Sequence, residues 1–133
     1  MAKAGERMQE MVLAILRREG QPRSAYELLS VLQANRPNLA PPSVYRALAA
    51  LTDKGVVHRI ESMKAYVASQ NAQAVDDCIL AICDDCGVVE ERLAPTLVDL
   101  ISTEAGKSGF AATRHVLEVH GFCAECAPRQ VQS

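Results

Sequence analysis

The residues with the clearest chemistry in this 133-residue chain are its five cysteines, four of which form two Cys-x-x-Cys pairs. Zn²⁺ prefers a tetrahedron of soft ligands, and a Cys-x-x-Cys turn lets two sulfurs reach one ion. Four thiolates leave no open position, so the pairs predict a closed, structural zinc site. Redox-active or merely buried thiols are the alternatives. The expected ligands are Cys83, Cys86, Cys123 and Cys126.

The fifth cysteine, Cys78, precedes the first pair and is not needed by a site that four thiolates already close. Residues two apart in a strand share a face, so Asp76 lies on the same face as Cys78 and Asp77 on the other. One interpretation of Cys78 is a buried, inert thiol. The other is a second zinc site of mixed S/N/O ligands, in which His58, Asp76 and Glu91 join the thiolate.

Three short helices are predicted before residue 56. Apolar residues over 8–16 recur at i, i+3, i+4, i+7 and i+8, which indicates one buried helix face. Ser24 opens a second helix, with Glu27 three residues on as a capping box. A third helix begins around Pro42, which fits the first helical turn, and ends at Lys54-Gly55.

The third helix and the strands after it are the part expected to meet DNA. Strands are predicted over 56–60 and 65–68, so the element order is that of a winged helix-turn-helix. The apolar stripe of the third helix leaves Ser43, Tyr45 and Arg46 exposed. Arginine binds guanine edges or phosphate, and tyrosine binds phosphate or packs on a thymine methyl. An ordinary amphipathic helix with a solvated arginine is the alternative.

The two halves of the chain carry opposite charge. Residues 1–70 hold ten Lys/Arg and six Asp/Glu, whereas residues 71–133 hold four and ten. This asymmetry favours an anionic partner for the first half.

The second half predicts a smaller domain behind a polar hinge. Its strands are expected over 76–83, 87–91 and 112–119, and its helix over 94–106. The fold class is therefore α+β, with a winged-helix DNA-binding domain over 1–68, a hinge over 69–75 and a metal-binding domain over 76–133.

The start of the chain shows no apolar signal-peptide core, and no apolar run approaches membrane-spanning length. We therefore expect a cytoplasmic protein whose thiols stay reduced. No activated nucleophile or open catalytic metal position is evident, so we expect neither enzymatic activity nor a small-molecule substrate.

Three segments resemble the ferric uptake regulator superfamily: "SAYELLSVL", "PPSVYRALAALTDKGVVHRIES" and "CDDCGVVEE…HVLEVHGFCAEC". The likeness covers roughly residues 9–127 and is closest to the zinc-sensing branch, the zinc uptake regulators. It implies a homodimeric, metal-activated repressor that binds pseudo-palindromic operator DNA. It also implies that the four-cysteine zinc is structural, that a second zinc at the hinge is the signal, and that the C-terminal α/β domain mediates dimerisation.

In the zinc-sensing pattern, the signalling ligands occupy four positions. Those positions hold His58, Ser69, Asp76 and Glu91. Because Ser69 stands where the family has a cysteine, we expect Cys78 to supply the thiolate. A metal ligand of several family members falls at His115, which predicts an additional site with Asp77. A histidine hydrogen-bonded inside the dimer sheet is the alternative for His115.

Two departures from the family predict weaker DNA binding. The chain is too short at its start for the family's extra DNA-touching helix, and Gln9 replaces an arginine of the first core helix. We interpret the sequence as a zinc-responsive repressor of zinc uptake genes. The alternatives are an iron or peroxide sensor, which Cys78 disfavours because thiolates prefer zinc, a zinc/thiol redox switch, and a zinc-ribbon module without DNA binding.

Overall fold

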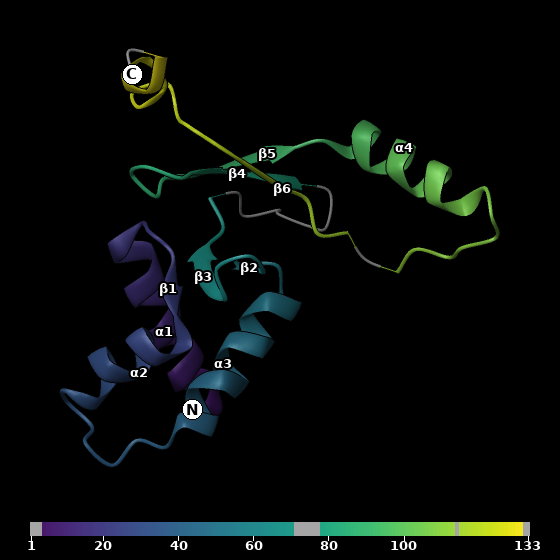
Figure 1. Ribbon diagram of the computed structural model, residues 1–133. Helices are drawn as coiled ribbons and strands as arrows, with labels where there is room; N and C mark the ends of the chain where they lie inside the picture. The colour runs from purple at the N-terminus through teal and green to yellow at the C-terminus, as the bar shows by residue number, and fades with distance from the viewer. Residues whose placement is uncertain (1–3, 71–77, 114, 132–133) are drawn as a thin grey trace. The chain divides into compact units, whose positions relative to one another are not determined.

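The computed structural model describes residues 4–70, 78–113 and 115–131, and the chain divides into two compact units, residues 1–72 and 73–133. Figure 1 shows the first unit from purple to teal and the second from teal to yellow. The first unit contains α1 (Ala4–Glu19), β1 (Arg23–Ser24), α2 (Ala25–Gln33), α3 (Pro41–Asp53), β2 (Val57–Ile60) and β3 (Ala65–Ala68). The second contains β4 (Cys78–Cys83), β5 (Val89–Leu93), α4 (Pro95–Gly106), β6 (Glu118–Gly121) and α5 (Ala127–Val131).

Local signals set the helix ends of the first unit. Gly20 adopts φ +66° directly after α1, a conformation that glycine reaches without strain. The predicted capping box forms at α2: Ser24 Oγ accepts from the Glu27 amide at 3.1 Å, and Glu27 Oε1 accepts from the Ser24 amide at 3.0 Å. At α3, Pro41 fills the first turn and Gly55 (φ +77°) follows the end. The three predicted helices are therefore confirmed.

The first unit packs these helices and a small sheet around one core. The strand order is β1-β3-β2, and both pairings are antiparallel. The wing strands lie where the sequence predicts them, whereas the two-residue β1 was not predicted. Core side chains come from all three helices and from β2, among them Val12, Leu16, Leu28, Val44, Leu48 and Val57.

The second unit has a sheet of order β5-β4-β6, in which β4 is antiparallel to β5 and parallel to β6. The predicted strand over 112–119 is largely wrong, because β6 begins only at Glu118. The parallel pairing of β6 with β4 starts opposite Leu80. Few residues of β4 precede Leu80, so a β6 strand that began earlier would have few residues to pair with. The short α5 was not predicted. No helix in the described ranges is long and apolar enough to cross a membrane.

Replacing Ser24 by alanine removes the hydroxyl that accepts from the Glu27 amide, whereas the backbone amide that donates to Glu27 Oε1 remains. We expect a loss of about 1 kcal/mol in the free energy of unfolding, measured by urea denaturation followed by circular dichroism. Ser30→Ala is the matched control, because Ser30 is exposed in the same helix. Equal stability of the two variants would contradict the assignment.

Candidate metal centre

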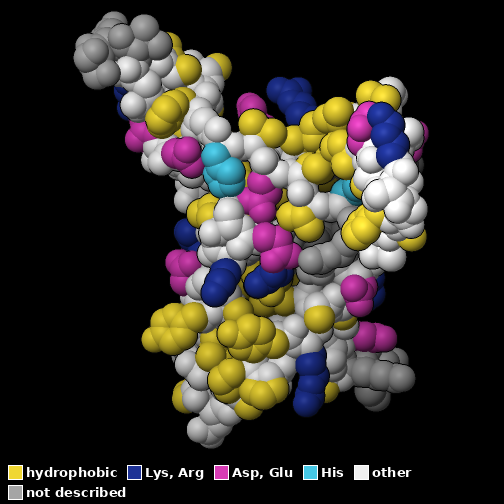
Figure 2. All heavy atoms as spheres, turned by 45° about the vertical axis from the view of Figure 1, so that its right-hand side comes forward, with side chains coloured by type: hydrophobic (Ala, Val, Ile, Leu, Met, Phe, Trp, Pro, Cys, Tyr) yellow, Lys and Arg dark blue, Asp and Glu magenta, His cyan; other side chains and the backbone are white. Residues whose placement is uncertain are grey.

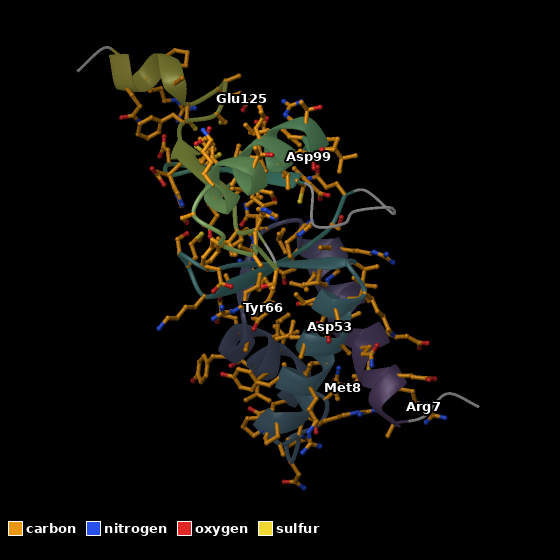
Figure 3. All side chains as sticks on the ribbon, turned by 90° about the vertical axis from the view of Figure 1, so that its right-hand side faces the viewer. Arg7, Met8, Asp53, Tyr66, Asp99 and Glu125 are labelled. Carbon is orange, nitrogen blue, oxygen red and sulfur yellow. The ribbon has the colours of Figure 1, made fainter. Side chains whose placement is uncertain are left out.

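Parallel pairing of β4 and β6 brings the two Cys-x-x-Cys pairs together. Cys83 is the last residue of β4 and lies opposite Gly121, the last residue of β6. Parallel strands end at the same edge of a sheet, so the turns that follow them emerge side by side. The Asp84 amide donates to the Gly121 carbonyl at 2.8 Å and fixes this junction. Figure 3 labels Glu125, which belongs to the second turn.

Each pair is held in a tight turn. The Gly87 amide donates to the Cys83 carbonyl at 3.1 Å, and the Cys126 amide donates to the Cys123 carbonyl at 3.0 Å. Gly87 adopts φ +81°, a value that side-chain-bearing residues reach only with strain. The turns aim the two sulfurs of each pair at a common point.

The four sulfurs have the spacing of a tetrahedral metal site. All lie within 4.8 Å of one another, and Cys86 Sγ is 3.8 Å from Cys123 Sγ. A tetrahedron with Zn–S bonds of about 2.3 Å has edges of about 3.8 Å. None of the four forms a disulfide. The donor set therefore fits Zn²⁺ with no position left for water or substrate.

The thiols differ in their readiness to ionise. The backbone amides of Cys123 and Cys86 lower the pKa of the Cys83 thiol to about 6. The side chain of Cys123, together with burial, raises the pKa of the Cys126 thiol. One sulfur thus holds negative charge easily while a neighbour is kept protonated, as expected when like charges crowd together. A divalent cation among the four sulfurs would offset this repulsion.

A second pair of ligands lies on the sheet away from the four-cysteine cluster. Glu91 is opposite Leu80, two residues from Cys78, so Cys78 and Glu91 share one face of adjacent strands. Their ligand atoms lie within 4.8 Å of each other, and both side chains are half-buried. The remaining predicted partner Asp76 lies outside the described residues, as does Asp77.

The other predicted ligands lie in different surroundings. His58 is half-buried in β2 of the first unit, opposite Val67. In the second unit, His115 Nε2 is 2.7 Å from Ser102 Oγ, which links the segment before β6 to α4.

His120 makes contacts that the sequence pattern did not predict. Its Nδ1 is 3.4 Å from Asp84 Oδ1, and its Nε2 is 3.3 Å from Glu118 Oε1. The ring thereby connects β6 to the turn of the first cysteine pair. This contact depends on the β4–β6 register, which a single sequence does not reveal.

The predicted DNA-contacting residues lie on α3. Its buried stripe is Val44, Ala47, Leu48 and Leu51, as predicted. Tyr45 is 57% exposed, Arg46 is exposed and Ser43 is half-buried. The side chains that could contact nucleic acid therefore stand on the open face of the helix.

The sequence pattern of the ferric uptake regulator family matches residues 3–120. The chain belongs to this family. A relative of this chain, the zinc uptake regulation protein of Escherichia coli (strain K12), is 43% identical to it over 104 residues, or 77% of this chain. The match spans 61% of that relative's length.

Two solved structures resemble this member of the ferric uptake regulator family throughout. A zinc uptake regulator complexed with zinc and DNA has a TM-score of 0.85 and 38% identity, covering 93% of this chain and 83% of the other. The crystal structure of holo XcZur has a TM-score of 0.83 and 38% identity, covering 91% and 84%.

Cys86→Ser tests the four-cysteine site, because it removes one ligand from an exposed position with little loss of packing. We expect loss of tightly held zinc and of the melting transition of the second unit, since structural zinc contributes on the order of 10 kcal/mol to folding. Metal analysis and differential scanning calorimetry measure these effects. Cys78→Ser is the control and should keep this zinc. Full zinc retention by Cys86→Ser would rule out the assigned ligand set.

Proposed function

We propose that this protein is a cytoplasmic, zinc-responsive transcriptional repressor that binds operator DNA as a homodimer and controls zinc uptake genes. The solved relative bound to zinc and DNA supports this proposal, as does the exposed α3 face with Tyr45 and Arg46. The proposed organisation is a DNA-binding domain over 1–68, a hinge over 69–75 and a dimerisation and metal-binding domain over 76–133. We propose no enzymatic activity for this regulator.

The observation that supports zinc as the signal is the proximity of Cys78 and Glu91. These ligands stand apart from the closed four-cysteine set and present one thiolate and one carboxylate on a single sheet face. We propose that His58 and Asp76 complete a regulatory zinc site with them. A thiolate ligand favours zinc, whereas an iron or peroxide sensor typically binds its metal through harder ligands.

Zinc in this proposed site would connect residues on both sides of the hinge. Its binding free energy would then favour arrangements of the DNA-binding domains in which two recognition helices reach successive major grooves, about 34–36 Å apart. An additional site at Asp77 and His115 stays a prediction. It would use Nδ1 of His115, because Nε2 contacts Ser102.

Homodimerisation is proposed from the apolar surface of the second unit, some of whose hydrophobic side chains are visible in yellow in the upper half of Figure 2. Helix α4 buries only Val98, although it spans twelve residues. An apolar surface of this kind favours a protein partner. The exposed large hydrophobic side chains in the described part of this unit are Val88, Leu93, Leu97, Leu100, Phe110, Val116, Val119 and Phe122.

Cys78→Ser tests the regulatory site. We expect two zinc ions per wild-type monomer and one in the variant, because the regulatory site loses its thiolate. Affinity for a promoter fragment of a zinc uptake gene should fall about tenfold, within the usual range of coupling between sites. Metal analysis after mild chelation and zinc restoration, followed by fluorescence anisotropy, measures both.

The double variant Cys78→Ser/Ser69→Cys is the matched control, because it returns a thiolate to the position at which the family has one. Recovery of the second zinc and of DNA affinity would support the site. One zinc in wild type and variant alike would sink the zinc-sensor proposal. Loss of the four-cysteine zinc under mild peroxide would instead favour the thiol redox switch.

Leu100→Glu tests the dimer, since a carboxylate in an apolar interface is costly to bury. We expect sedimentation velocity to show a shift from dimer to monomer. Tyr26→Glu is the control, because Tyr26 is 75% exposed in the first unit and should leave the dimer unchanged. A Leu100→Glu variant as dimeric as the control would remove α4 from the proposed interface.

A further inference from the structure

A groove of about 320 Å³ lies in the first unit between the N-terminal parts of α1 and α3. Met8, labelled in Figure 3, is one of the residues that line it and is itself buried. Leu39, from the segment between α2 and α3, adds further apolar surface. Polar groups reach the groove from three separate segments of the chain. These are Gln9 of α1, Arg36 of the α2–α3 connection, and Ser43 and Arg46 of α3.

The polar groups of the groove are nearly all hydrogen-bond donors. Gln9 Oε1 accepts from Lys54 Nζ at 2.6 Å, which leaves the Gln9 amide NH₂ to donate. The two guanidinium groups can only donate. None of the described residues that line the groove is an aspartate or glutamate. The groove therefore selects for an anionic acceptor.

Among the described residues, the two groove arginines lack the carboxylate partner that some arginines of the same unit have. Arg23 pairs with Glu19, and Arg59 pairs with Glu61. In the described part of the chain, neither Arg36 nor Arg46 has a hydrogen bond or ion pair through its side chain. Two exposed guanidinium groups at one groove give it a local excess of positive charge, which an anion bound there would offset.

We propose that this groove binds a backbone phosphate of DNA, with Arg36 as a phosphate ligand outside the recognition helix. The inference rests on the proposed DNA-binding function. A phosphodiester presents oxygen acceptors of the kind that a guanidinium binds in bidentate fashion. Such a contact fixes the position of α3 on the duplex and carries no base sequence information.

Arg36→Ala, measured on a random-sequence duplex of a few helical turns, tests the contact. We expect the affinity to fall about tenfold per subunit at low salt, as for loss of one charge-assisted hydrogen-bonded pair from each. The slope of log K against log salt should become shallower by about 1.8, because each of the two subunits loses one phosphate contact worth about 0.9. Affinity for a zinc uptake promoter fragment should fall by the same factor.

Arg17→Ala is the matched control, because it removes the same charge from an exposed position at the other end of α1. We expect its salt slope to equal that of the wild type. Arg36→Lys keeps the charge and should retain the wild-type slope. Circular dichroism checks that each variant is folded.

Two results would overturn the inference alone. One is an Arg36→Ala salt slope equal to that of Arg17→Ala. The other is an Arg36→Ala loss confined to the promoter fragment, which would make Arg36 a base-reading residue. Wild-type protein that binds neither duplex at low salt would overturn the proposed function together with this inference.

Discussion

The parallel register of β4 and β6 is the constraint on which the second unit depends. Pairing Cys83 with Gly121 ends both strands at the same edge and puts the turn after each at the same place. A shift of one residue would reverse the face presented by every side chain of β6 and displace its cysteine turn. The metal site and the sheet thus specify each other, because a bound ion holds the register and the register assembles the ligands.

The distribution of buried side chains explains why the second unit needs such a site. Among the described residues, fifteen buried hydrophobic side chains belong to the first unit and six to the second. Two of those six are Cys83 and Cys126, at 4% exposure each, so two of the four expected metal ligands make up a third of this core. A unit this thin gains little from apolar burial alone, and cross-linking by metal replaces the missing core. The first unit has the larger core, a helix capped by Ser24 and two helices followed by glycines, so it does not need a metal cross-link.

Features encoded within a few residues could be predicted from the sequence, and features set by pairing across the chain could not. The capping box of Ser24 and Glu27, the α3 stripe and the Cys-x-x-Cys pairs each need only local spacing. The prediction of a strand over 112–119 was largely wrong, because the extent of this strand depends on which residues of β4 are available to pair with it. The contacts of His120 with Asp84 and Glu118 follow from sheet register. No spacing rule contains that information.

The two proposed sets of zinc ligands differ in a way that would suit them to different tasks. All four cysteines of the structural set belong to one unit, and two of them are buried, so an ion held there stabilises that unit whatever the first unit does. Cys78 and Glu91 are half-buried and supply only two ligands, so firm binding requires others. If His58 supplies one, as proposed, the ion can remain bound only in arrangements that bring the wing to the sheet. A ligand acts as a signal only when its affinity differs between states, and only a site with ligands in both units has that property.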